Sequence, residues 1–288
     1  MAKAPTPSPR GDARDDDVEA PLIELRGIDK SFGDHVIFDD MHLEIYEGEL
    51  LSILGESGTG KSLASKMIVG LVQPDAGQVL FRGRDVLEMR RDELRVLRQE
   101  VSYVFQEDAL FDSMSILENV GYGLYEHTRL SDAEIRERAR KSLEVVGLEE
   151  RVLDLMPANL SGGMRKRVGL ARAVVQEPKI VLFDDPTRGL DPQSITRIGR
   201  MIADLRQRYE MTAVLITHDL RTAFAVSDRL TVLHGHKFPY SGTLEELRAL
   251  DNPDINDFLY DPDAAMRKRW AEADARYAAE HMFPPVQE

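Results

Sequence analysis

The sequence predicts an α/β protein with three parts: a core built on a parallel sheet, an antiparallel β subdomain and an inserted helical subdomain. The apolar runs "KIVLFDD" (residues 179–185) and "TAVLIT" (residues 212–217) are separated by helical sequence, which is typical of parallel strands. Residues 22–54 alternate apolar and polar side chains around a glycine-containing turn, and this pattern indicates antiparallel strands followed by a buried one. Residues 88–165 are charged and helix-like, and they form the expected insert.

The composition is that of a globular protein without a secretion signal or a membrane span. The chain has 288 residues, of which 42% are hydrophobic and none is cysteine, so we expect one large or two small cores and no disulfides. No window reaches the roughly 18 consecutive apolar residues of a transmembrane helix, and residues 1–20 lack the apolar core of a signal peptide. The net charge of −14 opposes binding to a nucleic-acid backbone, so we expect no nucleic-acid partner.

Shifts in composition divide the chain into segments. Residues 1–20 are rich in proline and aspartate and are predicted to form a disordered N-terminal tail. Residues 21–245 hold the α/β domain, with the helical insert at about residues 88–165. Residues 246–288 are again charged and helix-like, and we expect a C-terminal helical extension that carries the only tryptophan, Trp270.

One helix of the insert has recognisable ends. Ser131 is followed three residues later by Glu134, the spacing of a capping box at the start of a helix. Gly147 follows the helix-like stretch and suits the left-handed residue just after a helix. The sequence therefore predicts a helix between Ser131 and Gly147.

A glycine-rich stretch, "GESGTGKS", follows the apolar run "LLSIL". It matches the pattern G-x-x-x-x-G-K-[ST], in which the backbone N–H groups and the positive end of the next helix point at the phosphates of a nucleotide. We expect Lys61 to reach the β- and γ-phosphates and the Ser62 hydroxyl to ligate Mg²⁺. A glycine-rich turn that binds nothing is the alternative. The predicted nucleotide-binding residues are Gly55, Glu56, Ser57, Gly58, Thr59, Gly60, Lys61 and Ser62.

Two acidic residues end the apolar run of residues 180–183. In P-loop NTPases, a strand beside the phosphate loop ends in an aspartate that holds Mg²⁺, and Asp184 suits that role. Asp185 lies one residue further, where the chain turns toward the γ-phosphate, and we expect its carboxylate to polarise the attacking water. Solvation of both acids at the start of a loop is the alternative.

The segment "LSGGMRKRVGLARA" predicts a second phosphate site. It places Ser161, Gly162 and Gly163 at the start of a helix, where backbone N–H groups have no intrahelical partner. One nucleotide seldom needs two such sites in the same chain. We therefore expect this site to serve the nucleotide that is held by another copy of the protein.

Taken in this order, the motifs resemble those of the ATP-binding-cassette (ABC) ATPases over about residues 22–245. The resemblance implies a P-loop NTPase core with the ABC ATPase fold, and ATP and Mg²⁺ as cofactors. Phe32 looks like the aromatic residue that stacks on adenine, and Gln106 looks like the Q-loop glutamine, a catalytic residue that also ligates Mg²⁺. The run "GLD" that ends at Asp191 resembles the D-loop, which approaches the nucleotide, and His218 resembles the catalytic switch histidine.

The chain departs from the family pattern at Asp185. The family usually has glutamate at this position, and aspartate is one methylene shorter. The basicity of the carboxylate is similar. The aspartate side chain reaches less far than that of glutamate. Misplacement of a catalytic group by about 1 Å can lower a rate about 100-fold. The sequence thus predicts ATP binding, and a shorter reach of the catalytic carboxylate that can slow turnover.

The resemblance implies the ATP-hydrolysing motor subunit of an ABC transporter, acting as a dimer with integral membrane permease subunits at the cytoplasmic face of the inner (plasma) membrane. Met164 after the glycines and "PTRGLDP" after the acids resemble the ATPases of Mla-type and other MCE-linked lipid transporters of bacterial envelopes. MCE-type lipid-binding and small regulatory subunits are then expected partners. The alternatives are an ATPase for import of a small solute, such as an amino acid or metal, and a non-hydrolysing or soluble ABC protein with a regulatory or structural role.

Overall fold

The computed structural model describes residues 20–55, 58–107 and 109–250. The chain divides into one unit, Met1–Leu247, and a second, Arg248–Glu288, of which only residues 248–250 are described. The predicted tail (residues 1–20) and C-terminal extension (residues 246–288) fall almost entirely outside the described residues.

The N-terminal part forms an antiparallel sheet of four strands in the order β2-β1-β4-β5. In this sheet Ile23 of β1 lies opposite Ile45 of β2 and opposite Phe81 of β4, which confirms the predicted antiparallel pairing. The two later strands were not predicted from the sequence. The strands are β1 (Ile23–Phe32), β2 (His35–Ile45), β4 (Ala76–Phe81) and β5 (Arg84–Asp85).

The main sheet has six strands in the order β10-β9-β3-β8-β7-β6. All neighbours in it run parallel except β10, which is antiparallel to β9 at the edge. The predicted parallel strands are therefore confirmed. The strands are β3 (Leu50–Gly55), β6 (Val101–Val104), β7 (Ile180–Asp184), β8 (Thr212–Ile216), β9 (Arg229–His234) and β10 (Lys237–Gly242).

Strand β7 is buried on both faces and contributes to two hydrophobic cores. Val181 and Phe183 pack into one core together with the helices of the insert. Ile180 and Leu182 point the other way, into a core shared with the antiparallel sheet and helix α1. Because successive side chains of a strand point to opposite faces, a continuous apolar run suits a strand that is covered on both sides. This explains why the run of residues 180–183 contains no polar side chain.

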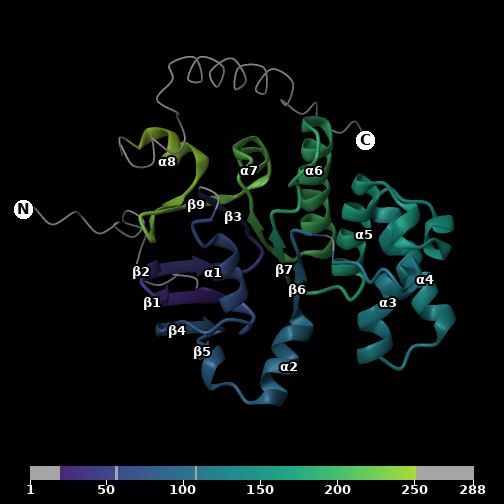
Figure 1. The fold of residues 1–288 in the computed structure, drawn as a ribbon, viewed down its shortest axis with the longest axis horizontal. Helices are drawn as coiled ribbons and strands as arrows, with labels where there is room; N and C mark the ends of the chain where they lie inside the picture. Colours follow the sequence, from purple (N-terminus) through teal and green to yellow (C-terminus); the bar gives the residue numbers. More distant parts are fainter. Residues whose placement is uncertain (1–19, 56–57, 108, 251–288) are drawn as a thin grey trace, which may run out of the picture. The chain divides into compact units, whose positions relative to one another are not determined.

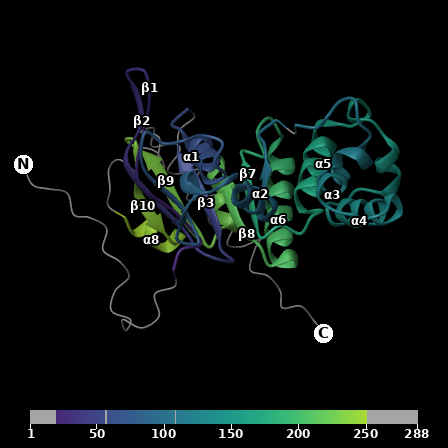
Figure 2. The same cartoon turned by 90° about the horizontal axis from the view of Figure 1, so that it is seen from below.

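Helices α3, α4 and α5 form a group beside α6, while α1 lies with β3 and β4 (Figures 1 and 2). The stretch expected as a helical insert, residues 88–165, also contains β6, a strand of the main sheet. No helix in the described part of the chain combines the length and apolar character that a membrane crossing requires. The helices are α1 (Lys61–Ile68), α2 (Arg91–Glu100), α3 (Ile116–His127), α4 (Asp132–Val145), α5 (Gly162–Val174), α6 (Pro192–Tyr209), α7 (Leu220–Val226) and α8 (Leu244–Ala249).

The ends of α4 confirm the predicted helix. Ser131 accepts a hydrogen bond from the Glu134 backbone N–H, and the Glu134 carboxylate accepts one from the Ser131 N–H, which completes a capping box. At the other end Gly147 has a φ of 67°. The N–H of Leu148 donates to the carbonyl of Leu143, the longer bond of a Schellman motif. Local sequence signals therefore set both ends of this helix.

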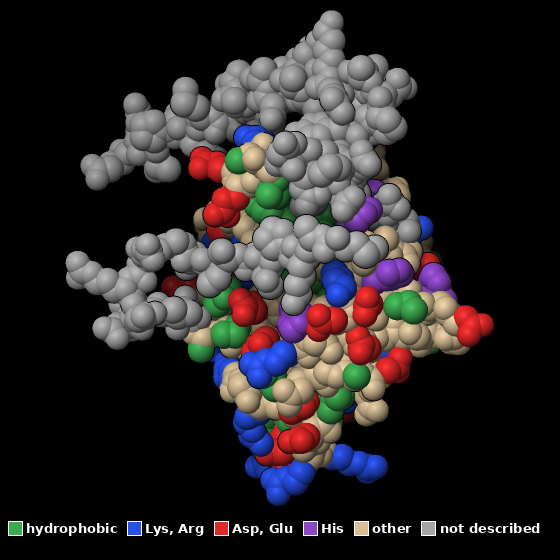
Figure 3. Space-filling view, turned by 90° about the vertical axis from the view of Figure 1, so that its left-hand side faces the viewer, with side chains coloured by type: hydrophobic (Ala, Val, Ile, Leu, Met, Phe, Trp, Pro, Cys, Tyr) green, Lys and Arg blue, Asp and Glu red, His purple; other side chains and the backbone are tan. Residues whose placement is uncertain are grey.

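Basic side chains gather at the lower end of the face shown in Figure 3, the end where α2 and β5 lie in Figure 1. In this region Arg84 pairs with Glu93, 2.5 Å between their nearest nitrogen and oxygen atoms. Arg82 pairs with Glu100 at 2.7 Å. The positive charge of these side chains is thus balanced by neighbouring acids.

Candidate nucleotide site

The carboxyl ends of β3, β7 and β8 meet at one edge of the main sheet. Ile216 of β8 pairs with Ile53 of β3 on one side and with Asp184 of β7 on the other. Residues that follow these positions therefore lie side by side, in the part of an α/β sheet where ligands usually bind. The glycine-rich loop follows β3, Asp185 follows β7 and His218 follows β8.

The described part of the glycine-rich loop requires glycine at its two ends. Gly55 has a φ of 148°, and a Cβ there would lie 2.7 Å from the carbonyl oxygen of Leu233. Gly60 has a φ of 109°, and a Cβ there would lie 2.5 Å from Cγ2 of Ile37. Gly60 is also the N-cap of α1, and no side chain caps this helix. The loop thus presents backbone and a helix N-terminus, the elements of a phosphate cradle. Glu56 and Ser57 lie outside the described residues.

Lys61 lies across the loop. Its side chain is largely buried, with the residue 9% exposed. The Nζ ammonium donates to the carbonyl of Gly55 at 2.9 Å. The side chain thus returns from the end of the glycine-rich loop to its first residue. An ammonium in this place can pair with phosphate oxygens. Gly58 and Thr59 complete the described part of the loop between Gly55 and Lys61.

Asp184 is held at both of its oxygens. It is 4% exposed and ends β7. Oδ1 accepts from the Ser62 hydroxyl at 2.5 Å, and Oδ2 accepts from the Tyr103 hydroxyl at 2.9 Å. Burial first, and then the charge of Asp184, raise the pKa of Tyr103, so this hydroxyl keeps its proton. Sequence reasoning missed Tyr103. The signal was present, because a tyrosine inside a buried strand needs a partner for its hydroxyl.

Asp185 contacts His218. Its backbone N–H donates to the carbonyl of Ile216 at 2.9 Å, and its φ is 46°, in the left-handed region. Oδ2 lies 3.1 Å from Nδ1 of His218. Oδ1 is buried and has no hydrogen-bond partner among the described residues. A buried carboxylate oxygen without a donor can accept a hydrogen bond from a water or ligand at this edge.

Gln106 lies two residues past the end of β6. This strand pairs in parallel with β7, with Val104 opposite Phe183, so the segment that holds Gln106 leaves the sheet at the same edge as Asp184 and Asp185. Its carbonyl accepts a hydrogen bond from Nζ of Lys166 in α5 at 2.5 Å. The loop that holds Gln106 is thus attached to the helix that begins with the predicted second phosphate site.

That second site lies away from the phosphate loop of the same chain. Ser161 is the N-cap of α5 and accepts from the N–H of Met164 at 3.3 Å. Gly162 and Gly163 form the first turn, and a Cβ on Gly163 would have no neighbour within 4 Å. Both ribbon views place α5 in the helical group, apart from α1 (Figures 1 and 2). Within one chain these helix starts are not brought together.

Two further predicted residues lie at other positions. Asp191 is the N-cap of α6: its carboxylate accepts from the N–H groups of Gln193 and Ser194, both at 3.1 Å. The Ser194 hydroxyl also donates to it and lowers the pKa of Asp191. Phe32 ends β1, is 57% exposed, and has the Lys30 ammonium 5.3 Å from its ring centroid. Its ring is thus available for stacking.

The donors at the sheet edge fit Mg²⁺. Mg²⁺ binds through hard oxygen ligands, and beside a nucleotide it takes one or two of them from the protein and the rest from phosphates and water. Ser62 Oγ and Asp184 Oδ1 offer such oxygens 2.5 Å apart. No group of three or more histidine, cysteine or acidic side chains in the described residues could hold a metal ion alone. The donor set thus matches a cation that is shared with a nucleotide.

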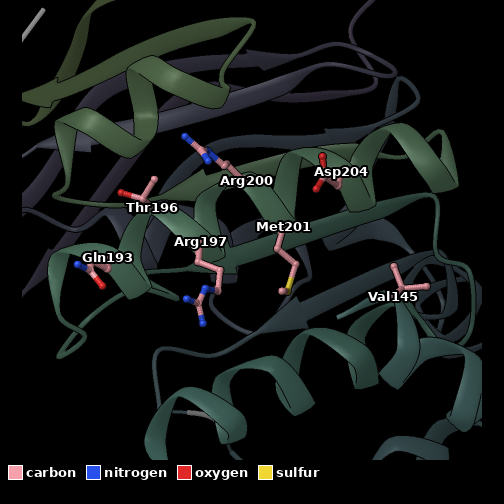
Figure 4. A pocket seen from close by; sticks show the side chains of 7 residues that line it. All are labelled: Val145, Gln193, Thr196, Arg197, Arg200, Met201 and Asp204. Carbon is pink, nitrogen blue, oxygen red and sulfur yellow. The ribbon is translucent and has the colours of Figure 1, made fainter. Parts of the chain in front are cut away.

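A pocket elsewhere in the chain is distinct from this site. It lies along α6, has a volume of about 380 Å³ and includes Val145 from the end of α4 (Figure 4). Arg197 and Met201 extend from α6 toward the helices of the insert. None of the predicted nucleotide-site residues lines it.

Comparison with known proteins agrees with this geometry. Residues 38–188 match the family model described as ABC transporter. The chain is 38% identical over 239 residues to "Probable ribonucleotide transport ATP-binding protein mkl" of Mycobacterium leprae, covering 82% of this chain and 68% of that one. It is 35% identical over 240 residues to the "Intermembrane phospholipid transport system ATP-binding protein MlaF" of Escherichia coli, covering 83% and 89%.

A solved structure matches as well. The dimeric post-hydrolysis state of the ATP-binding cassette MJ0796, bound to ADP and Pi, superposes with a TM-score of 0.71 and 32% identity over 77% of this chain and 99% of that one. The fold and the ordered motifs define a nucleotide-binding cassette of the P-loop class. The chain belongs to the ABC transporter family. It is an ATPase, it resembles the Mla-type members, and the predicted fold class is confirmed.

Proposed function

We propose that this protein is the motor subunit of a lipid transporter in the bacterial cell envelope, working as an ATP-sandwich dimer on integral membrane permease subunits. It would act peripherally, at the cytoplasmic face of the inner membrane. The observation that carries the motor role is the pairing of Asp185 with His218 beside the pairing of Ser62 with Asp184, at one edge of the sheet. A chain that only bound ATP would have no use for the first pair.

The chemistry follows from the positions of the side chains. Lys61 and the loop backbone bind the phosphates of ATP. Ser62 and Asp184, with Gln106 nearby, would hold Mg²⁺, which neutralises charge on the phosphates. Asp185 accepts a proton from the attacking water at Oδ1 while His218 holds its other oxygen. The bond between the β-oxygen and the γ-phosphorus breaks as the new bond to the water oxygen forms, giving ADP and phosphate.

The dimer is supported by the separation of the two helix starts. Helix α5 begins in the helical group with Ser161, Gly162 and Gly163, and a Cβ on Gly163 would meet no atom within 4 Å. The phosphate loop leads into α1, which lies apart from this group (Figure 1). In a head-to-tail pair, the α5 start of one copy can cover the nucleotide of the other. Each nucleotide is then enclosed only when two copies meet.

A patch of exposed aromatic residues supports a membrane partner. Phe111 and Tyr122 are 44% and 40% exposed, and their ring centroids lie 5.1 Å apart. Phe105, 39% exposed, directly precedes Gln106. Exposed apolar clusters mark interaction surfaces. A permease segment that contacts Phe111 would meet the chain a few residues beyond Gln106, and so could sense the nucleotide.

The lipid cargo is supported by similarity to MlaF, which covers 83% of this chain and 89% of that one at 35% identity. Met164, which follows the two glycines of "LSGGM", is a further resemblance to the ATPases of lipid transporters. The name of the mycobacterial relative, a probable ribonucleotide transport ATP-binding protein, favours transport of a small solute, and import of such a solute is the second candidate. MCE-type lipid-binding and small regulatory subunits belong to the first candidate alone.

Purification of the native complex tests the choice between cargoes. We expect copurifying permease subunits, an MCE-type subunit and bound phospholipid detected by mass spectrometry. Recovery of a permease with a soluble solute-binding subunit and no lipid would support the second candidate. Recovery of ribosomes or of the chain alone, without membrane proteins, would contradict both.

A further inference from the structure

A closed set of hydrogen bonds surrounds Asp184. Ser62 Oγ donates to Oδ1 at 2.5 Å, and the Tyr103 hydroxyl donates to Oδ2 at 2.9 Å. The Tyr103 hydroxyl also lies 2.8 Å from Ser65 Oγ, and Ser65 Oγ lies 3.0 Å from the Ser62 carbonyl. The contacts join α1, β6 and β7 in one ring.

The number of protons sets the direction of these bonds. An ionised carboxylate only accepts, and a tyrosine hydroxyl has one proton to give. Tyr103 therefore donates to Asp184, and the single proton of Ser65 is shared between the Tyr103 oxygen and the Ser62 carbonyl. With a donor at each oxygen, the Asp184 carboxylate cannot rotate without breaking a bond to a charged group, which is among the stronger hydrogen bonds in proteins.

Tyr103 also belongs to the strand that leads to Gln106. It pairs with Leu182 across the parallel ladder between β6 and β7. Its ring lies against that of Phe105, with centroids 4.5 Å apart. A displacement of the Gln106 loop thus reaches the Tyr103 hydroxyl through two residues of chain and one ring contact.

We infer that Tyr103 is a positioning residue, whose hydroxyl orients the Asp184 carboxylate for Mg²⁺ and links that orientation to the strand that carries Gln106. The inference rests on the proposed role of Asp184 at Mg²⁺. Tyr103 itself touches neither nucleotide nor metal in this scheme. It acts by keeping Oδ1 turned toward Ser62.

A purely structural role for Tyr103 makes a different prediction. If the hydroxyl only satisfies a buried polar group, replacing tyrosine by phenylalanine changes thermal stability in the absence of nucleotide and leaves the Mg²⁺ dependence of ATP binding unchanged. If the hydroxyl orients Asp184, the same change raises the Mg²⁺ concentration needed for ATP binding. The ring contact with Phe105 is retained in both cases.

The test is a Mg²⁺ titration of the full chain with a fluorescent, non-hydrolysable ATP analogue. We expect Tyr103→Phe to raise the Mg²⁺ midpoint about tenfold, the effect of one hydrogen bond to a charged group, with metal-free binding within about twofold of the parent. Ser65→Ala should shift the midpoint in the same direction by about threefold or less, because Tyr103 can still donate. Tyr209→Phe, a half-buried tyrosine of α6, is the matched control and should not shift it.

Asp184→Asn separates the two ways in which the idea can fail. If Asp184→Asn raises the Mg²⁺ midpoint and Tyr103→Phe does not, the positioning role of Tyr103 is wrong and the metal site stands. If neither variant raises it, the assignment of Asp184 to Mg²⁺ is itself wrong. Thermal unfolding without nucleotide, measured on each variant, shows that the compared proteins are folded.

Discussion

Asp185 occupies a backbone conformation that suits aspartate better than glutamate. Its φ of 46° lies in the left-handed region, which aspartate and asparagine enter more readily than residues with longer side chains. In this conformation its carboxylate already reaches His218 at 3.1 Å. The sequence predicts a shorter reach than that of glutamate, and a left-handed backbone at Asp185 is a conformation that favours the shorter side chain.

Asp185→Glu should therefore lower the hydrolysis rate. The longer side chain is less compatible with a φ of 46° and would press against His218. We predict a several-fold loss in steady-state ATPase rate with the partner subunits present, with ATP binding unchanged. A rate above that of the parent would show instead that the site is limited by reach.

Asp185→Asn tests whether Asp185 is the general base. Asparagine tolerates the same backbone and keeps a partner for His218, but it cannot take a proton from water. We predict a loss of at least about 100-fold in ATPase rate, retained ATP binding and accumulation of the closed dimer. Asp184→Asn should differ, because it weakens Mg²⁺-ATP affinity itself. Equal rates in Asp185→Asn and the parent would remove Asp185 from the mechanism.

Lys61→Ala removes the ammonium that lies over the phosphate loop at Gly55. We predict loss of nucleotide-dependent activity, because the charge of the triphosphate is no longer offset. Lys66→Ala, in the last turn of the same helix, is the control and should behave as the parent. Normal ATPase activity in Lys61→Ala would overturn the phosphate-loop assignment.

Among the elements, the start of α3 depends on one buried amide. Asn119 is 0% exposed. Its Oδ1 accepts from the Phe111 N–H at 2.7 Å, and its Nδ2 lies 3.0–3.1 Å from the carbonyls of Phe111, Met114 and Ser115. One side chain therefore holds the loop that carries the exposed aromatic patch against its helix.

Asn119→Ala should destabilise this element. Its loss leaves buried backbone groups of the loop without partners, and we predict a decrease of about 2–3 kcal/mol in the free energy of unfolding. Gln99→Ala, an exposed position of α2, is the control. Denaturant unfolding measures both variants. A change below about 0.5 kcal/mol in Asn119→Ala would show that water replaces the amide.

Local sequence signals predict some helices and strands but not others. Ser131, Glu134 and Gly147 define α4 because capping groups act within a few residues of chain. β6 escaped prediction because Val101–Val104 is a four-residue strand between charged stretches, and only its pairing with β7 makes it a strand. The formation of β6 therefore depends on tertiary contacts and not on its local sequence.

At the scale of the whole molecule, the order of the motifs along the chain was enough to predict the fold and the edge where the site lies. Which side chains touch was not predictable. The pairing of Asp185 with His218 and of Tyr103 with Asp184 depends on the register of β6, β7 and β8, which no local pattern specifies. Ser161 and Asp191 were both assigned to the nucleotide, and in a single chain both act as helix caps.

Ser161→Arg should separate binding from assembly. The added side chain at the exposed start of α5 would block the approach of a second copy, while the phosphate loop of the same chain is untouched. We predict nearly normal ATP binding by the isolated subunit and loss of ATP-driven dimerisation and turnover, measured by light scattering and steady-state assay. Gln207→Arg places the same charge on an exposed position of α6 as a control. Full-rate hydrolysis by the isolated monomer would contradict the shared site.

The exposed ring of Phe32 bears on which nucleoside triphosphate the protein binds. A phenyl face with a neighbouring ammonium 5.3 Å away attracts any flat purine, and stacking is tolerant of base identity because every base has a π-face. Discrimination between adenine and guanine requires hydrogen bonds to the base edge, which a phenyl ring does not make. If Phe32 carries the base, this stacking contact does not by itself distinguish ATP from GTP, and any preference between the two must come from a hydrogen bond that another group makes to the base edge.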